Sequence, residues 1–273
     1  MKKLLCTLVV MVMALTVLAG CGSSGSSSSG NNPAPPPPPP PSAAIESIIV
    51  GLDENFPPMG FRDEQNELTG FDIDLAKEVA SRLGMEVTFQ PINWDSKELE
   101  LKGGKVDVLW NGLTITEARR ENILFTNPYL ANSQVILVSE DSDITGKADL
   151  AGKDVGVQKG SSAVEAIEAD EATAATLSLK EYENNTEACT DLEIGRISAV
   201  VLDEIVARYY STLKPGLFKV LDENFGSEEY GIGTRLEDTE LNGKIQKALD
   251  EMIADGKAAE ISKKWFGEDK LLK

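Results

Sequence analysis

The sequence predicts an α/β protein whose folded part contains two lobes of similar size. Apolar strand-like runs alternate with helical patterns from residue 48 onward, and such alternation is typical of α/β folds with a largely parallel sheet. Roughly 225 residues follow the N-terminal segments, enough for two lobes of about 110 residues each. The composition, with 41% hydrophobic and 26% charged residues, is that of a globular protein.

The first set of elements combines three expected strands with two helices. Phe71, Leu75, Val79 and Leu83 recur every four residues, which indicates an amphipathic helix that Gly84 should end. The other expected elements are strands at 48–52, 87–89 and 106–110, and a short helix at 97–102 that a glycine pair ends.

A second set begins near residue 134 and follows the same alternation. Its expected strands lie at 135–138, 155–157, 177–179 and 197–202, its helices at 162–169, 187–194 and 204–210, and a small helical turn at 149–153. The pattern predicts a second α/β unit. After it, a further strand is expected at 230–234 and helices at 241–254 and 258–266.

The N-terminus is predicted to be an export signal. Lys2 and Lys3 precede an apolar run at 4–18, whose length suits a signal peptide and is short for a membrane span. The run ends in Leu18-Ala19-Gly20-Cys21, which resembles the bacterial lipobox. The resemblance implies cleavage after residue 20 and acylation of Cys21, and an ordinary secretory signal is the alternative.

Residues 21–44 are predicted to be a tether between the lipidated cysteine and the folded part. Residues 22–30 are rich in serine and glycine, which favours a flexible coil, and residues 35–41 are all proline. A polyproline II segment of this length projects roughly 20 Å. We interpret it as a spacer rather than as a ligand for proline-binding domains.

Charge and residue usage exclude several functions. The formal net charge is −19 and no basic patch is visible, which argues against nucleic-acid binding and against adhesion to anionic lipid. The absence of histidine excludes Ser-His-Asp and Cys-His catalysis and histidine metal sites. Only Cys189 would remain in the mature fold, so an intrachain disulfide and a cysteine zinc site are excluded. We expect no cofactor and no metal.

The most informative stretch is 106–120. It reads as a short buried strand, a polar turn at Asn111-Gly112, the hydroxyls of Thr114 and Thr116, and then Arg119. A hydroxyl and a guanidinium that converge at a strand end can hold a carboxylate with charge-assisted hydrogen bonds. The alternative is a capping threonine followed by a solvated arginine.

Together these elements resemble the bacterial extracellular solute-binding proteins of the polar-amino-acid family, which serve ABC importers. The resemblance extends from about residue 48 to 267. Its strongest pieces are Gly70-Phe71-Asp72-Ile73-Asp74-Leu75, residues 107–119, residues 125–129, Asp149-Leu150-Ala151-Gly152-Lys153 with Val155-Gly156-Val157, and Lys264-Trp265-Phe266-Gly267.

The resemblance implies a two-lobed, periplasmic-binding-protein-like (type II) fold with two crossover hinge strands. Lobe 1 would comprise residues 45–131 and 228–273, and lobe 2 residues 132–227, with crossovers near 130–133 and 226–229. An L-amino acid would bind between the lobes and close them. It also implies delivery to a membrane-embedded ABC permease by a lipid-anchored extracytoplasmic protein, which we expect to be a monomer.

The family pattern implies how an amino acid would be held at its charged ends. Arg119 would clamp the carboxylate with the hydroxyl of Thr114, and Ser161 and Ser162 would present a helix N-terminus to it. Asp203, directly after a strand, would bind the α-ammonium together with the Gly112 carbonyl. A local alternative makes Asp203 and the serines simple helix caps.

Five further residues are expected around the guest side chain. Phe56 and Trp94 match positions where family members stack aromatic rings, although core packing is the alternative for each. Asp53 could meet a polar or cationic group, and its alternative is a solvated turn aspartate. Asn111 and Gln158 replace small or apolar residues, or a lysine, of other members. This set favours a neutral polar or cationic side chain over an acidic one.

Two other functions remain as alternatives. Some dehydratases and glycan-cleaving domains share this fold, but the sequence offers no recognisable acid/base pair, so we do not expect an enzyme. A ligand-sensing surface protein is the other alternative, although no signalling domain accompanies the lobes.

Overall fold

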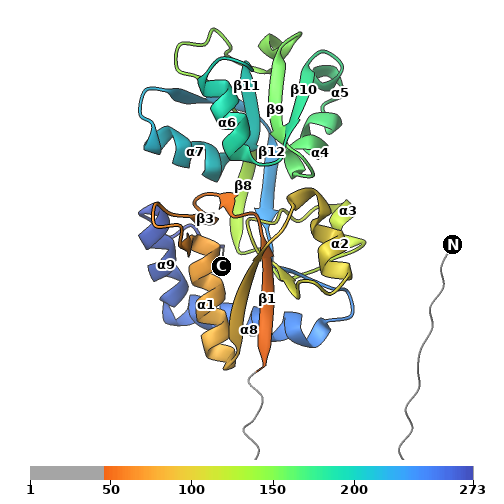
Figure 1. Cartoon of the computed structure of the whole chain (residues 1–273), viewed down its shortest axis with the longest axis vertical. Coiled ribbons are helices and arrows are strands. Elements are labelled where there is room, and N and C mark those ends of the chain that lie inside the picture. The colour runs from red at the N-terminus through yellow and green to blue at the C-terminus, as the bar shows by residue number, and fades with distance from the viewer. Residues whose placement is uncertain (1–45, 273) are drawn as a thin grey trace, which may run out of the picture. The chain divides into compact units, whose positions relative to one another are not determined.

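The computed structural model describes residues 46–272. The predicted signal peptide, the lipidation site Cys21 and the tether lie outside this range. Among the described residues, no helix combines the length and apolar character needed to cross a membrane. Two five-stranded sheets form the framework (Figure 1), and we call the parts built on them lobe 1 and lobe 2.

Lobe 1 is built on a mixed sheet in the order β5-β1-β6-β13-β7. Strand β1 runs parallel to β5 and β6, whereas β13 runs antiparallel to β6 and β7. The strands are β1 (Ser47–Leu52), β5 (Glu86–Pro91), β6 (Val108–Leu109), β7 (Leu124–Phe125) and β13 (Gly233–Thr234). The helices are α1 (Phe71–Leu83), α2 (Lys97–Lys102), α3 (Glu117–Arg120), α8 (Thr239–Asp255) and α9 (Lys257–Phe266), with a 3-10 turn at Trp94–Ser96.

Lobe 2 is built on a second sheet in the order β10-β9-β11-β8-β12. Strands β9, β10 and β11 are parallel, and β8 pairs antiparallel with β11 and β12. The strands are β8 (Leu130–Ser139), β9 (Asp154–Gln158), β10 (Ser178–Tyr182), β11 (Ala199–Asp203) and β12 (Phe218–Tyr230). The helices are α4 (Ser162–Ala169), α5 (Glu171–Ala174), α6 (Asn185–Glu193) and α7 (Glu204–Leu213), with a 3-10 turn at Lys147–Leu150.

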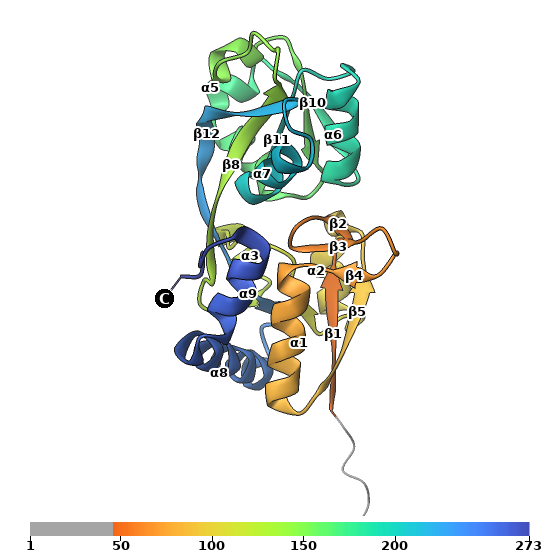
Figure 2. The same ribbon diagram turned by 90° about the vertical axis from the view of Figure 1, so that its left-hand side faces the viewer.

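Strands β8 and β12 connect the two lobes (Figure 2). They form one antiparallel ladder in which Leu130 pairs with Tyr230, Ser133 with Ser227 and, farther into lobe 2, Leu137 with Val220. Both segments expected to cross between the lobes therefore lie side by side at one end of this ladder. The register shifts twice between Val220 and Ser227, and such bulges let a ladder bend and twist between two bodies.

Periodic segments form the elements that the sequence predicts. Helices α2 and α4 have the predicted bounds. Helix α1 buries Phe71, Leu75 and Val79 on one face and ends at Gly84, whose φ of 67° is the left-handed conformation that glycine favours. Burying each large apolar side chain contributes about 1.5–3 kcal/mol, so these residues fix the helix against the sheet.

Several predicted strands differ in extent from the observed ones, two of them because of specific contacts. The strand expected at 106–110 is observed only as β6. Next to it, the N–H of Ile49 donates to the side-chain Oδ2 of Asp107 at 3.0 Å and not to a backbone carbonyl, so the regular strand pairing does not extend to Asp107. The strand expected at 230–234 is two pieces, because Tyr230 ends β12 in one sheet and β13 belongs to the other.

Several short elements and one long strand were not expected. They are the small sheet of β2 (Asn55–Phe56), β3 (Gly60–Arg62) and β4 (Leu68–Thr69), strand β7, helix α5, and most of β12. Strands of two or three residues are too short to show an alternation, and β12 is largely polar and partly exposed.

Asp72 ties helix α1 to the turn after β6. Its carboxylate accepts hydrogen bonds from Gly112 N–H at 2.7 Å and from the Tyr129 hydroxyl at 2.9 Å. Burial raises the pKa of Asp72 to about 7, against the lowering effect of these hydrogen bonds. The sequence places Asp72 inside a family motif, and its contacts show that it positions Gly112.

Asp72→Asn should remove a pH-dependent contribution to stability. The pKa of Asp72 is higher in the folded than in the unfolded protein, so the folded state holds a proton more tightly. This contribution to the free energy of unfolding is complete below the ordinary pKa of an aspartate and is lost as pH rises through about 7. The full difference is about 4 kcal/mol. Urea unfolding should show a steeper loss of stability for the wild type than for the variant between about pH 5 and about pH 8. Exposed Glu86→Gln is the control, and parallel profiles for wild type and Asp72→Asn would contradict the assignment.

Candidate functional site

The predicted site residues lie where the two lobes meet, and all of them are buried. Lobe 1 provides Asp53, Phe56, Trp94, Asn111, Gly112, Thr114 and Arg119, and lobe 2 provides Gln158, Ser161, Ser162 and Asp203. Most of these side chains are polar, and burying polar groups costs free energy unless they find partners.

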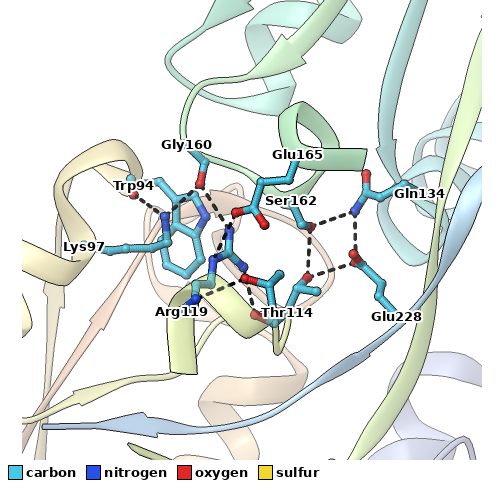
Figure 3. Close-up of polar contacts among 10 residues, drawn as sticks. Trp94, Lys97, Thr114, Arg119, Gln134, Gly160, Ser162, Glu165 and Glu228 are labelled. Carbon is cyan, nitrogen blue, oxygen red and sulfur yellow. Dashed lines mark hydrogen bonds and ion pairs between the residues drawn. The ribbon is translucent and has the colours of Figure 1, made fainter. Parts of the chain in front are cut away.

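Arg119 is buried between the lobes instead of solvated. Its side chain is 3% exposed, and Nη1 donates to the carbonyl of Thr114 at 2.9 Å (Figure 3). Nη2 donates across the lobes to Gly160 O at 3.3 Å, and Nε lies 3.9 Å from Glu165. Thr116 does cap α3, as the alternative expected, by accepting from Arg119 N–H. Burial lowers the pKa of Arg119, yet a guanidinium stays charged in proteins, so its remaining N–H groups can receive an anion.

The carbonyl of Gly160 also accepts a hydrogen bond from Lys97, for which the sequence predicts only a place at the start of a helix. Lys97 is 4% exposed, and its Nζ lies 2.7 Å from Gly160 O and 3.2 Å from Trp94 O. Burial, and then the charge of Arg119, lower the pKa of Lys97 to about 7. The sequence does carry one sign that Lys97 is buried: it lies four residues before Leu101, which places both residues on the same, buried face of α2.

A chain of hydrogen bonds joins the lobes beside Arg119. Gln134 Nε2 donates to Ser162 Oγ at 3.2 Å, and Ser162 and Thr114 hydroxyls lie 3.0 Å apart (Figure 3). Thr114 donates to Glu228 at 2.9 Å. Because a carboxylate only accepts, Thr114 commits its one proton to Glu228, and Ser162 must donate to Thr114. Glu228 and Gln134 were not predicted, because no motif marks the hinge strands.

Asp203 is a buried carboxylate at the end of β11. Its Oδ1 accepts from Asn132 Nδ2 at 2.7 Å and from the Tyr230 hydroxyl at 2.5 Å. It stands at the N-cap position of α7, but its side chain makes no capping hydrogen bond. Burial, and then the nearby charge of Glu228, hold the pKa of Asp203 well above its ordinary value. The capping alternative therefore does not account for this side chain.

Asp53 and Gln158 meet across the lobes at the other side of the site. Gln158 Nε2 donates to Asp53 Oδ2 at 2.7 Å and Asn185 Nδ2 donates to Gln158 Oε1 at 3.3 Å. Asp53 also accepts from Asn55 N–H at 2.8 Å, which is the turn role of the alternative. It is nevertheless 7% exposed, not solvated, and burial raises its pKa.

Several buried polar atoms in this region have no hydrogen-bond partner within residues 46–272. They are both amide atoms of Asn111, Oε1 of Gln134, Oγ of Ser161 and Oδ1 of Asn185. Ser161 begins α4 without capping it. Buried polar groups in native proteins are almost always satisfied, so these unpaired atoms are candidates for hydrogen bonds to a polar guest.

The two aromatic residues are packed among core residues, as their alternative expected. Phe56 belongs to the large cluster that includes Trp110 and Tyr129, and Trp94 packs with Leu101. No group of three or more acidic or cysteine side chains suited to a metal is found in the described part of the chain.

The comparisons with known proteins identify the family. The model of bacterial extracellular solute-binding proteins, family 3, matches residues 48–268. The chain belongs to this family. The predicted resemblance, the two-lobed α/β fold and a substrate-binding role are thereby confirmed. Family members are extracellular or periplasmic proteins.

Curated relatives and solved structures agree with this membership. The chain is 34% identical over 236 residues to the histidine-binding periplasmic protein of Escherichia coli, covering 84% of this chain and 90% of the relative. It is 30% identical to the L-cystine-binding protein TcyJ of the same organism, covering 82% and 84%. A Streptococcus pneumoniae ABC transporter substrate-binding protein with bound histidine matches with TM-score 0.81 and 39% identity, covering 83% and 95%.

Gly160→Ala should hinder the approach of the lobes. Gly160 has a φ of 68°, and a Cβ there would lie 2.8 Å from the Cα of Asp95 in the other lobe. Gly152→Ala is a matched control, because its φ is 71° and a Cβ would meet nothing within 4 Å. Small-angle scattering should find Gly160→Ala more open than the control at equal thermal stability. Indistinguishable scattering profiles would mean that the lobes do not meet at Gly160 in solution.

Proposed function

We propose that the protein captures an L-amino acid between its lobes and delivers it to a membrane-embedded ABC permease. The observation that carries this proposal is the presence of two buried groups, the guanidinium of Arg119 from lobe 1 and the carboxyl group of Asp203 from lobe 2. An amino acid is a zwitterion, and a closed site must offer a counter-charge to each of its ends.

The carboxylate of the guest would lie against Arg119. The guanidinium keeps donors that its contacts with Thr114 and Gly160 do not use. Ser161 and Ser162 open α4, and the first N–H groups of a helix are unpaired and carry partial positive charge. The Thr114 hydroxyl can donate a further hydrogen bond to the guest carboxylate once its hydrogen bond to Glu228 is broken.

The α-ammonium would lie against Asp203, with the carbonyl of Gly112 as a second acceptor. Gly112 adopts a φ of 59° and is packed against Phe56 and Tyr230, and Asp72 holds its N–H. Its position is therefore fixed before a guest arrives, which reduces the entropy that binding costs.

The guest side chain would lie towards Asp53, Asn111 and Gln158, with Phe56 and Trp94 as apolar walls. These groups suit a neutral polar or cationic side chain. Support comes from relatives whose names specify histidine and arginine, and from an ancestral arginine-binding protein, 43% identical, solved with arginine and with glutamine.

We further propose that Cys21 is acylated and anchors the protein outside the cytoplasm through the tether, and that the mature protein is monomeric. The lipobox-like sequence supports the anchor. Mass spectrometry of the membrane fraction would test it, since Cys21→Ser should abolish the lipid and release the protein.

We propose no enzymatic activity. One similar structure, 35% identical with TM-score 0.75, is an ancestral amino acid-binding protein described as a precursor of cyclohexadienyl dehydratase, so the fold is compatible with catalysis. One-to-one binding without product formation would support transport, and turnover of any bound amino acid would refute it.

A thermal-shift screen against the common amino acids tests the function directly. A guest at 100 times its Kd should add about 2.7 kcal/mol to the free energy of unfolding. Polar and cationic amino acids should raise Tm, and no shift with any amino acid would contradict the proposal.

Arg119→Ala should weaken binding of the amino acid found in that screen by at least about 2 kcal/mol, because a carboxylate would be left unpaired in a closed site. Its exposed neighbour provides the control, Arg120→Ala, which should bind as the wild type does. Calorimetry decides, and equal affinity of the Arg119 variant would reject the clamp.

Asp203→Asn should weaken binding without unfolding the protein. The variant keeps an acceptor for Asn132 and Tyr230 but removes the charge opposite the ammonium. We expect a Tm without guest at or above that of the wild type, since a neutral amide replaces a buried acid that lies beside Glu228. A collapse of that Tm would make Asp203 structural.

A further inference from the structure

A second carboxylate, from the hinge, lies beside Asp203. Asn132 Nδ2 donates to Asp203 Oδ1 at 2.7 Å and also to Glu228 Oε1 at 2.6 Å. One amide nitrogen therefore bridges the two carboxylates. The distance between Asp203 Oδ1 and Glu228 Oε1 cannot exceed the sum of the two hydrogen-bond lengths. The Asn132 carbonyl accepts from Ile205 N–H at 3.5 Å, which agrees with the amide group facing both acids.

Neutral donors alone hold this pair. Glu228 Oε1 accepts from Thr114, Asn132 and Gln134, and Asp203 accepts from Asn132 and Tyr230. Among the described residues, no lysine or arginine forms an ion pair with either carboxylate. Arg119 is close enough to feel both charges but directs its donors to Thr114, Gly160 and Glu165. Two adjacent carboxylates without a cation favour uptake of one proton.

We propose that Glu228 is a further binding residue, which together with Asp203 forms a two-carboxylate seat for the α-ammonium of the guest. In the empty protein the pair retains one proton, and the arriving ammonium displaces it to solvent. An ammonium has three N–H donors, so it can bond both acids and the Gly112 carbonyl. This inference rests on the proposed function, to which it adds Glu228 as a binding residue and the release of one proton when the guest binds.

The surroundings provide a route for the displaced proton. A cavity of about 560 Å³ lies on the hinge side of the pair and is lined by both Asn132 and Glu228. Glu228 is only partly buried, whereas Asp203 is 4% exposed. The elevated pKa of Asp203, caused by burial and by the charge of Glu228, agrees with a proton residing there. Other charged or titratable groups that face the pair or line this cavity are Arg119, Tyr230, Glu117, Arg120, Glu204 and Glu229.

Displacement of a proton makes binding depend on pH. The empty protein binds more protons than the complex, so affinity should rise with pH by up to about tenfold per pH unit below the pKa of the pair and level off above it. Glu228→Gln removes a negative charge from beside Asp203. This should lower the pH at which the affinity levels off, which we call the levelling point. The substitution should also reduce the affinity on the plateau by about tenfold, because a neutral amide oxygen replaces a charged acceptor of the ammonium.

Calorimetric titration from about pH 5 to about pH 8 tests this with L-arginine and L-glutamine, whose own groups do not titrate in that range. Glu229→Gln is the matched control, because that neighbouring glutamate is exposed, and it should keep both the levelling point and the plateau. Asp53 can add its own pH dependence, but Glu228→Gln leaves that unchanged. An unmoved levelling point overturns the proposal, even if affinity falls, since a structural role would weaken binding equally at every pH.

Infrared spectroscopy of the empty protein separates this proposal from the proposed function. At neutral pH the wild type should show the C=O stretch of a protonated carboxyl whose titration midpoint falls in Glu228→Gln. Absence of the band, or an unmoved midpoint, overturns the shared proton even if amino acids bind. Its presence without amino-acid binding would leave the proton pair standing while the proposed function fails.

Discussion

The desolvation of charged groups between two lobes is the constraint on which the site depends. Arg119 and Asp203 are almost fully buried. Neutral groups donate to Asp203, which lies beside Glu228, and the carboxylate of Glu165 lies 3.9 Å from Arg119. Isolated buried charges cost several kcal/mol each. A guest that carries both opposite charges offsets this cost at two places at once, and its contacts with both lobes favour the closed state over the open one.

The architecture places the candidate site between two sheets that one ladder joins. Each lobe has its own sheet, and the β8–β12 ladder carries the chain between them. Polar contacts cross between the lobes: Asp53 with Gln158, Thr114 with Ser162, and Lys97 and Arg119 with Gly160. Polar contacts of this kind are exchanged for water at small net free energy, so breaking them adds little to the cost of separating the lobes.

Much of the fold could be predicted from the sequence, because its long elements are periodic and their ends carry glycine. Helices α1, α2 and α4 and strands β1, β9 and β11 follow from apolar spacing within a single segment. The short strands β2, β3, β4 and β7 depend on contacts distant in sequence and leave no local pattern. Strand β12 could not be predicted for the same reason, since its partner β8 lies some 90 residues earlier and its exposed positions are polar.

The residues of the candidate site also separate into those that the sequence predicts and those that it does not. Arg119, Thr114 and Asp203 could be predicted, because each follows a strand at a position that a family motif marks. Gln134 and Glu228 could not, since their contacts arise only when the hinge strands β8 and β12 meet residues of both lobes. For Lys97 the spacing to Leu101 indicates burial, but its contact with Gly160 of the other lobe has no local signal.

The decisive experiment is a crystal structure of the protein with the amino acid that it binds most tightly. We expect a closed form in which the carboxylate of the guest receives hydrogen bonds from Arg119 and from the start of α4, and its ammonium lies within hydrogen-bond distance of Asp203. A guest bound outside the contact between the lobes, or one whose ammonium faced Arg119, would contradict it.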